Sequence, residues 1–349
     1  MNDKNIISVN PLPAPTWNWL HLNETAAEFP SAFGAAEASL SGAVSESADY
    51  ADWKNYPSGM GVQLANAVGT SNFGAVLLAS AGENETAQAK LHFDFNGGDL
   101  CRRVAISAKA GADLTVIMDY ASAPDCAGNF AVQTEITAER GAKIKLVQLQ
   151  LLGKGCTVFN DIAASCESGA SVSLIQFFLG SGKTYSGCEA RLEGDESRFE
   201  AEIGYFGKEN QAFDMNYNAV HLGKRTRSIM NAGGVLDDGA EKIFRGTIDF
   251  KRGSAGSKGD EKEDVLLLGD DVVNKTIPLI LCAEEDVQGN HGASIGRLDE
   301  ALLFYLASRG LTAEQAEALM ARAKLDALCA KIGDAEAQKS VEEYLEAAE

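Results

Sequence analysis

Positive charge is scarce in this sequence of 349 residues. Its 30 lysine and arginine residues are outnumbered by 50 aspartate and glutamate residues, and the formal net charge at pH 7 is −20. A surface of that sign repels phosphate backbones and anionic lipids, which argues against a nucleic-acid partner and against a membrane-surface role. The sequence also lacks any run that approaches the roughly 20 apolar residues of a membrane-spanning helix. A protein partner remains open.

Targeting and disulfide signals are missing as well. The first residues, MNDKNIISVNPLPAP, contain no apolar core segment and no small-residue cleavage site, so we expect no signal peptide. The seven cysteines are odd in number and include no CxxC pair, which indicates a reducing compartment rather than a disulfide framework. We therefore expect a cytoplasmic protein.

A short pattern recurs along the middle of the chain: an apolar or small residue, polar residues, a glycine, and then alternating residues. The clearest strings are ISAKAGADLTV, ITAERGAKIKL, ASCESGASVSL and VLDDGAEKIF, and a weaker copy is ARLEGDESRFE. Their glycines are Gly111, Gly141, Gly169, Gly239 and, in the weaker copy, Gly194. The first three intervals, of 30, 28 and 25 residues, are regular, whereas the last, of 45, requires an insertion or an unrecognised copy.

The residues after each glycine alternate in polarity, which is typical of β-strands. Leu114 and Val116 hold the same phase as Ile144 and Leu146 in the next copy. Recurrence at this period, without helical periodicity between about residues 75 and 250, predicts an all-β solenoid, a parallel β-helix whose coils stack about 4.8 Å apart. An antiparallel β-sandwich with coincidental turns is the alternative.

The flanks of the repeat differ from it in composition. We expect three regions: an N-terminal flank over residues 1–74, a β-helix core over 75–280 and a C-terminal helical subdomain over 281–349. In the last region, LDEALLFYLASRG predicts a helix that Gly310 ends, and Thr312 with Gln315 forms a capping-box pattern that opens a second helix. Gly333 and Asp334 separate that helix from a third. Such helices are one way to close the exposed end of a solenoid.

Two features of the core resemble functional sites but are weak. The string LGSGKTYS resembles a phosphate-binding loop, yet Phe177 stands where the first glycine is required and no helix is expected to follow, so we interpret it as a solenoid corner. Cys126 and Cys156 each lie 15 residues past a repeat glycine, so they could stack on adjacent coils and bind metal or sulfur, or merely pack. Cys166 occupies a phase held by alanine in other copies and is expected to be a core residue.

The last third of the chain carries a more specific pattern. It contains VHLGKRTRSIMNAGGVLDDGAEKIFRGTIDF, then DVLLLGDD, then AEEDVQGNHGASIGRLDEALLFYLASRG and LTAEQAEAL. Together these strings resemble the SufB/SufD family, most densely over about residues 215–325, and LPAPTWNW near the start loosely resembles the beginning of SufD proteins.

The resemblance implies a right-handed parallel β-helix core with helical flanks and a non-enzymatic scaffold role in iron–sulfur cluster assembly. In that family SufB and SufD pair through their β-helices, and each binds the ATPase SufC through its C-terminal helical region. For this chain it implies a SufC-like ATPase bound after Leu298, with Leu303, Phe304 and Tyr305 as candidate contacts, and a SufB-like paralogue or a second copy as the other partner. No cofactor is expected to stay tightly bound to the isolated chain, and a transient iron–sulfur cluster or iron would sit at a subunit interface.

His291 is one of only four histidines and lies between Asn290 and Gly292. SufB-type chains have an acidic residue directly after this histidine, whereas Gly292 follows it here, so the motif resembles that of SufD. The resemblance to SufD implies that His291 is an interface ligand for iron or a cluster. Neutral imidazole is a suitable iron ligand, and the thiolates that clusters also require would come from the SufB partner. SufD proteins often have a cysteine two residues earlier, where this chain has Gly289, so only a single-ligand contribution carries over. Without the resemblance, a lone histidine in a loop is more often structural.

Two alternatives stay open at this point. A β-helix carbohydrate-active enzyme would use acidic groups on one strand face, and Asp214, Asp237, Asp238 and Asp249 are the candidates, although they read as solvated turn residues. A divergent, homodimeric SufD-like protein would have no cluster role of its own. The sequence does not distinguish a heterodimer with a SufB-like chain from a homodimer.

Overall fold

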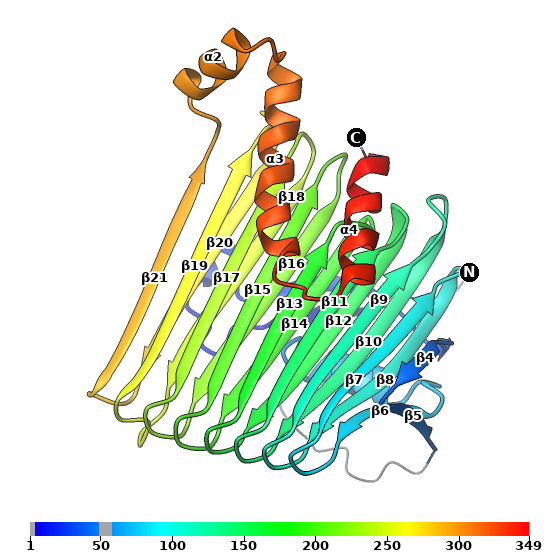
Figure 1. The fold of residues 1–349 in the computed structure, drawn as a ribbon, viewed down its shortest axis with the longest axis vertical. Helices are drawn as coiled ribbons and strands as arrows, with labels where there is room; N and C mark the ends of the chain where they lie inside the picture. The colour runs from blue at the N-terminus through cyan, green and yellow to red at the C-terminus, as the bar shows by residue number, and fades with distance from the viewer. Residues whose placement is uncertain (1–3, 49–57, 349) are drawn as a thin grey trace.

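A computed structural model of the chain describes residues 4–48 and 58–348, and its core is a parallel β-solenoid (Figure 1). The strands from β6 to β21 alternate between two sheets, so that each pair of consecutive strands makes one of about eight turns. Sheet 1 contains β6 (Val76–Ala81), β8 (Gly98–Ala108), β10 (Ala127–Ala138), β12 (Gly155–Cys166), β14 (Lys183–Leu192), β16 (Ala212–His221), β18 (Glu241–Phe250) and β20 (Val273–Cys282). Sheet 2 contains β7 (Thr86–Asp94), β9 (Asp113–Ala121), β11 (Lys143–Leu151), β13 (Ser171–Phe178), β15 (Arg198–Gly207), β17 (Arg227–Leu236), β19 (Ser257–Leu267) and β21 (Val287–Gly296).

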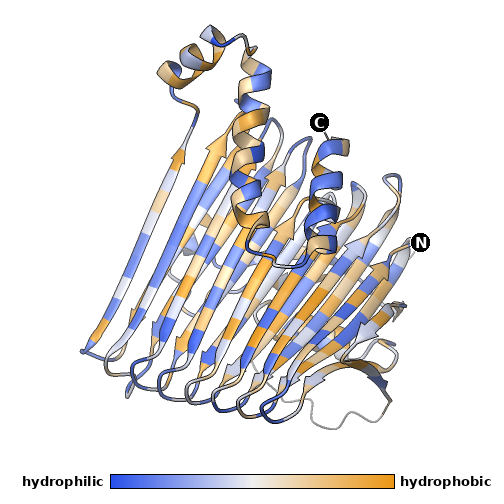
Figure 2. Cartoon of the chain, in the orientation of Figure 1, coloured by the Kyte–Doolittle hydropathy of each residue, from blue (hydrophilic) through white to orange (hydrophobic). Residues whose placement is uncertain are grey.

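The predicted all-β solenoid is confirmed, since neighbouring strands from β6 to β21 pair in parallel rather than as an antiparallel sandwich. Leu114 pairs with Ile144, which pairs with Val172, and all three are buried between the sheets. Apolar and polar residues alternate along the strands, as Figure 2 shows. Each fully buried aliphatic side chain of this kind contributes about 1.5–3 kcal/mol relative to an exposed one.

The repeat glycines Gly111, Gly141 and Gly169 occupy the same corner of successive coils, as predicted. Their φ angles are 70°, 69° and 68°, a left-handed region that glycine adopts without steric cost. The Gly111 N–H donates to the carbonyl of Arg140 in the next coil at 3.0 Å, and the Gly141 N–H donates to Ser168 at 3.0 Å. These bonds tie each corner to the next one along the solenoid axis.

Two of the proposed repeat glycines do not belong to this corner. The residue of the fifth coil that takes the left-handed conformation is Glu196, with φ of 62°, so Gly194 lies two residues too early. Gly239 lies at the opposite corner of the solenoid, where the strand pairing aligns it with Asn210 and Ser181. Both corners require a positive φ, so the Gly-Ala string could not distinguish them, and the interval of 45 residues needs no insertion.

The N-terminal flank covers the outer face of sheet 1 and the first turn. Its elements are β1 (Lys4–Val9), a 3-10 helix η1 (Asn18–Leu20), β2 (Thr25–Pro30), β3 (Gly34–Ala35), β4 (Ser39–Gly42), β5 (Val44–Ser47) and α1 (Val62–Gly69). β4 and β5 pair antiparallel with β7 and β6, so the strand edges of the first turn are covered. The fully buried Arg245 anchors the flank, because its guanidinium contacts Asp214 Oδ1 at 2.6 Å, the Thr25 hydroxyl at 3.0 Å and the Leu22 carbonyl at 2.9 Å.

Three C-terminal helices follow β21: α2 (Glu300–Ser308), α3 (Ala313–Cys329) and α4 (Ala335–Ala348). The predicted capping box of Thr312 and Gln315 is present, and Gly310 and Gly333 have φ of 95° and 76° at the two helix ends. α3 and α4 pack on the outer face of sheet 2, where Leu325, Cys329, Val341 and Leu345 join a second apolar cluster with Phe177 and its neighbours. Among the described residues, no helix is both long enough and apolar enough to cross a membrane.

The helices do not close the C-terminal end of the solenoid, contrary to one expectation from the sequence. They lie against a sheet face, and α2 with the first half of α3 projects beyond the strands (Figure 1). The strand pairing also continues past residue 280, because β21 pairs with β19 through Gly296. The glycine-rich stretch around His291 is therefore a strand of the solenoid rather than a loop.

Candidate functional site at the open end of the solenoid

The last turn of the solenoid has two unpaired strand edges. β20 ends sheet 1 and β21 ends sheet 2, and no other described strand pairs with their outer sides. Val273 and Ile295 on these strands expose 36% and 45% of their surface. An exposed strand edge offers unpaired backbone N–H and C=O groups, and proteins normally cover or blunt it. The strand edges at this end are left uncovered by the described residues.

His291 lies on β21 with its side chain on the inner phase of the strand. Its register partners toward the core are Glu261 on β19 and the fully buried Met230 on β17. The neighbouring position on the same face, Gly289, also points inward, since a Cβ there would lie 2.9 Å from a methyl group of Ile280. The imidazole nevertheless remains exposed, because no further coil of the described residues covers it. His291 is accessible from the open end.

Charged residues replace the apolar core just beneath His291. The ammonium of Lys242 on β18 forms an ion pair with Glu263 on β19, and both side chains are fully buried. Lys242 also donates to the Thr276 hydroxyl at 3.3 Å, and that hydroxyl donates to the second oxygen of Glu263. Burial lowers the pKa of Lys242, while Glu263 acts in the opposite direction. Glu263 is thus fully satisfied within the chain.

Glu261 is the exception in this charged group. Its side chain is 4% exposed, and its Oε1 atom has no hydrogen-bond partner. Burial, reinforced by the neighbouring charge of Glu263, raises the pKa of Glu261 to about 7. Glu261 and Glu263 could not be recognised in the sequence because SKGDEKEDV carries a charged residue at most positions, which hides the two-residue period of an inward-facing strand.

The core leaves little room for a side chain at Gly289, where the resemblance raised the question of a cysteine. A cysteine at this position would need room beside Ile280 and Phe250, whose atoms would lie 2.9 and 3.1 Å from its Cβ. Cys282, at the end of β20, is exposed, but the described residues contain no group of three or more histidine, cysteine or acidic side chains that could hold a metal ion. The open end therefore supplies part of a metal site at most.

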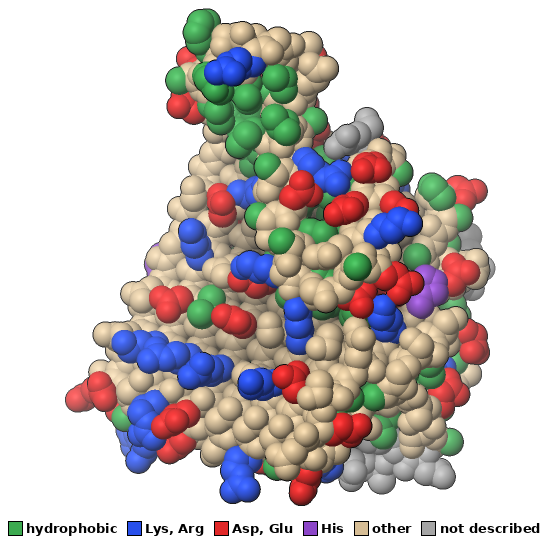
Figure 3. Space-filling view, in the orientation of Figure 1, with side chains coloured by type: hydrophobic (Ala, Val, Ile, Leu, Met, Phe, Trp, Pro, Cys, Tyr) green, Lys and Arg blue, Asp and Glu red, His purple; other side chains and the backbone are tan. Residues whose placement is uncertain are grey.

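The three residues predicted to contact a partner lie on α2, and they differ from one another in exposure. Phe304 and Tyr305 expose 76% and 51% of their surface, whereas Leu303 is half-buried. None of the residues of α2 is buried, although the helix is rich in leucine and aromatic residues. Apolar side chains gather on this projecting part of the molecule in Figure 3, and Leu319 of α3 is 49% exposed.

The remaining motifs take structural roles. LGSGKTYS forms a solenoid corner followed by β14 rather than by a helix, and a Cβ at Gly182 would lie 2.3 Å from the Lys154 carbonyl.

Cys166 is fully buried, as predicted. Cys126 and Cys156 do lie on adjacent coils, and the Cys156 thiol contacts the Cys126 carbonyl at 3.4 Å. Burial, with a smaller effect of Cys126, raises the pKa of Cys156 to about 12, so its thiol stays protonated at neutral pH and ligates metals poorly.

The acidic residues considered for carbohydrate chemistry are not gathered in a cleft. Asp214 was expected in a solvated turn, but it is buried in β16 and paired with Arg245. Asp249 is also buried and pairs with Lys251 at 2.7 Å. Asp237 and Asp238 lie at a corner of the solenoid. The ion pairs of Asp214 and Asp249 therefore have a structural role.

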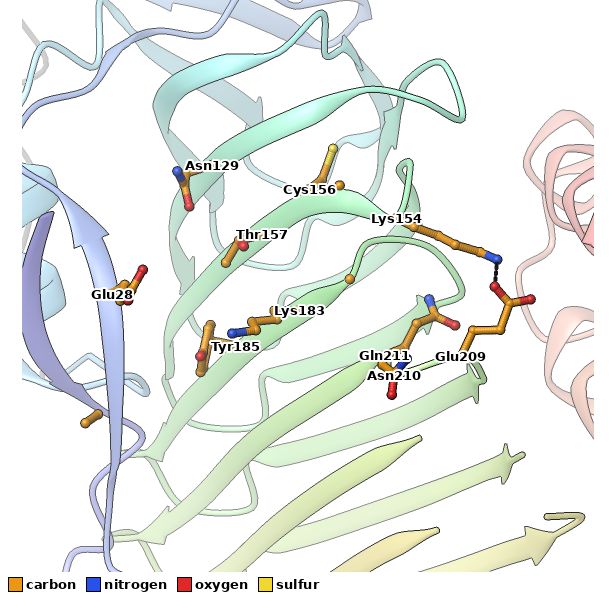
Figure 4. A pocket seen from close by; sticks show the side chains of 13 residues that line it. Glu28, Asn129, Lys154, Cys156, Thr157, Lys183, Tyr185, Glu209, Asn210 and Gln211 are labelled. Atoms are coloured by element: carbon orange, nitrogen blue, oxygen red, sulfur yellow. Dashed lines mark hydrogen bonds and ion pairs between the residues drawn. The ribbon is translucent and has the colours of Figure 1, made fainter. Parts of the chain in front are cut away.

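A polar cavity of about 610 Å³ lies between β2 and the outer face of sheet 1 (Figure 4). Glu28 of β2 faces Lys183 and Tyr185 of β14 across it, and Lys154 and Glu209 form an ion pair at its rim. None of its lining residues belongs to β19, β20 or β21. The cavity is separate from the open end.

The string GASIG after His291 matches the GxSxG pattern of serine hydrolases. It lies within β21, and the strand-to-helix turn that exposes the nucleophile in those enzymes is absent from this stretch. The match therefore carries no catalytic meaning here.

Comparison with known proteins gives one consistent family. The family model described as "SUF system FeS cluster assembly, SufBD core domain" matches residues 93–324. The chain is 26% identical to the iron-sulfur cluster assembly protein SufD of Bacillus subtilis over 235 residues, which are 67% of this chain and 54% of that protein. It is 27% identical to a SufBD family protein of Synechocystis sp. over 242 residues, 66% of this chain and 50% of the relative. SufB of Bacillus subtilis matches over 152 residues at 28% identity, 43% of this chain and 32% of that protein.

The chain belongs to the SufB/SufD family of iron–sulfur cluster assembly proteins. It spans about half the length of the relatives that it matches over the most residues. The matched region begins in β7 and ends in α3, so it contains His291, the charged residues beneath it and α2.

Proposed function

We propose that this chain is a SufD-type scaffold subunit of an iron–sulfur cluster assembly complex and that it catalyses no reaction by itself. The observation that supports the proposal most is the combination of an open solenoid end with an unburied apolar helix, in a chain of the SufB/SufD family. Each of these surfaces is costly for an isolated protein, and each suits one of two partners. The complex would assemble in the cytoplasm.

The open end is the proposed surface for a SufB-like paralogue. The outer edges of β20 and β21 can continue both sheets into a second solenoid, because parallel strands of another chain would satisfy the unpaired backbone groups. A second copy of this chain would present the same edges, so a homodimer without its own cluster role is the competing assembly. The two assemblies differ in composition and mass.

The apolar surface of α2 is the proposed site for a SufC-like ATPase. Phe304 and Tyr305 are its most exposed aromatic residues, and such side chains dominate the binding energy of protein interfaces. Leu303 is better placed to hold α2 in position, since it is half-buried. The corner formed by LGSGKTYS offers no nucleotide site, so ATP hydrolysis would be the work of the partner.

Iron or a nascent cluster is the proposed cargo at the interface with the SufB-like chain. His291 can provide one neutral nitrogen ligand from the open end, and thiolates would come from the partner. In this arrangement no iron or cluster stays tightly bound to the isolated chain.

Co-expression with SufC-like and SufB-like proteins tests the proposal. We expect the three chains to co-purify as one complex, and we expect Phe304→Ala with Tyr305→Ala to release the ATPase while the SufB-like chain stays bound. Trp19→Ala is the matched control, since Trp19 is 96% exposed on the opposite flank of the chain. Deletion of residues 298–349 should also abolish ATPase binding. Unchanged ATPase affinity in both variants would contradict the assignment of α2.

A further inference from the structure

Glu261 has features that its role in the fold does not explain. It is 4% exposed, its Oε1 atom has no hydrogen-bond partner, and the buried ammonium of Lys242 is paired with the adjacent carboxylate of Glu263. A buried carboxylate oxygen without a hydrogen-bond partner destabilises a fold, so it requires an explanation, and a bound ion that the isolated chain lacks is one.

The opposite sheet leaves space for the Glu261 side chain. Gly246 of β18 faces it, and a Cβ at Gly246 would lie 2.9 Å from Glu261 Cγ and 3.2 Å from its carboxyl carbon. In the next turn Gly246 pairs with Pro278, which has no N–H to donate. The backbone opposite Glu261 thus provides room for the side chain, and Pro278 offers no donor for its carboxylate.

His291 is the next polar side chain along the same face. It is the register partner of Glu261 in the parallel pair of β19 and β21, and both residues occupy the inner phase of their strands. Neighbouring strands of a sheet lie about 4.7–4.9 Å apart, so the side chains of register partners on one face are close enough to be two ligands of one metal ion. The histidine is exposed at the end, and the carboxylate lies one strand deeper.

We infer that Glu261 is a second metal-ligating residue beside His291, so that the open end carries a half-site of one carboxylate oxygen and one imidazole nitrogen for a divalent first-row metal ion, ferrous iron as cargo. Both ligand types suit ferrous iron. The inference rests on the proposed function for the identity of the cargo. The described residues offer no third ligand, so the site is completed by a chain docked on β20 and β21.

Anaerobic titration of the purified, untagged chain with Co²⁺ tests the half-site, with calorimetry and visible absorption as readouts. We expect Glu261→Gln and His291→Ala each to weaken cobalt binding at least about tenfold, and the double variant to be no weaker than either single variant. Asp260→Asn is the matched control, because Asp260 lies on the outer face of the same strand beside Asn290. It should bind cobalt as the unmodified chain does.

Two outcomes would overturn the inference: no measurable cobalt binding by the unmodified chain, or unchanged binding by Glu261→Gln. Thermal denaturation of the same samples separates ligand loss from unfolding, and a Glu261→Gln chain that is folded but binds poorly supports the half-site. Co-purification with the SufB-like and SufC-like proteins is measured separately, since neither variant alters α2. Failure of that assembly with intact cobalt binding would reject the proposed function and leave the half-site standing.

Discussion

Single buried side chains near the end of the solenoid determine how its stability depends on pH. Glu261 and Glu263 are two residues apart on the same strand face, yet only Glu263 has a buried cation and a hydroxyl donor. An ionised Glu261 is therefore unfavourable in the folded chain, whereas the unfolded chain hydrates it freely. The fold tolerates this residue rather than gaining from it.

Glu261→Gln is expected to stabilise the isolated chain at pH 8 and to have little effect near pH 5. The folded-state pKa of Glu261 is raised from 4.5 to about 7, so the folded chain holds the proton more tightly than the unfolded chain. Stability is therefore full below about pH 4.5 and is lost as the pH rises through 7, by up to about 3 kcal/mol. Urea denaturation at both pH values measures the difference. Equal stability of the two chains at pH 8 would contradict the buried, ionised carboxylate.

His291→Ala should leave the melting temperature of the isolated chain nearly unchanged. The imidazole is exposed, and a substitution at such a position normally alters stability by less than about 0.5 kcal/mol. The same variant should lower cluster formation on the assembled complex, measured by the visible absorption of the cluster. A large loss of stability with normal cluster formation would make His291 a structural residue.

At the scale of the elements, the corners of the solenoid are the part of the fold that the sequence predicts best. Gly111, Gly141 and Gly169 could be aligned because each is followed by a buried alanine and an alternating strand. The alignment failed where other residues take the left-handed conformation, as Glu196 does, and where Gly239 serves the opposite corner. A short stretch of sequence therefore predicts that a corner has a left-handed backbone conformation, but it does not predict at which of the two corners of the coil it lies.

Gly141→Ala should destabilise the chain by about 1–2 kcal/mol, the cost of a left-handed conformation for a residue with a Cβ. No atom lies within 4 Å of a Cβ placed on Gly141, so the effect measures backbone strain alone. Gly292→Ala is the control, because Gly292 has equal free space without a positive φ. Chemical denaturation of the two variants should differ by that amount, and equal stability would argue against the corner conformation.

The strand that carries His291 shows why the candidate site was only partly predictable. QGNHGAS has four small residues and no apolar alternation, so it is typical of a loop, and only its pairing with β19 identifies it as a strand. The histidine itself was found through the family resemblance. Glu261 could not be found, because its importance arises from burial opposite Gly246 and from pairing across a distance of 30 residues.

At the scale of the whole molecule, the two ends of the solenoid differ in whether their strand edges are covered. The first turn is covered by β4 and β5, which pair antiparallel with its strands, while the last turn has no such cover among the described residues. A molecule with a net charge of −20 would resist pairing with itself through long-range repulsion. The asymmetry favours an open end reserved for a specific partner over indiscriminate edge-to-edge association.

Ile295→Glu should block that association. Ile295 lies on the inner phase of β21 and is 45% exposed, so a docked coil would bury it, and a carboxylate there would enter the interface without a partner. We expect at least about tenfold weaker binding of the SufB-like chain, or of a second copy, in size-exclusion chromatography with light scattering. Ile6→Glu, at a residue of β1 that is 76% exposed, is the control and should assemble normally.

Both variants should melt at nearly the temperature of the unmodified chain, since neither side chain is buried in it. If Ile295→Glu assembled as tightly as the control, the edges of β20 and β21 would not be the interface, and the half-site at His291 would have no second chain to complete it.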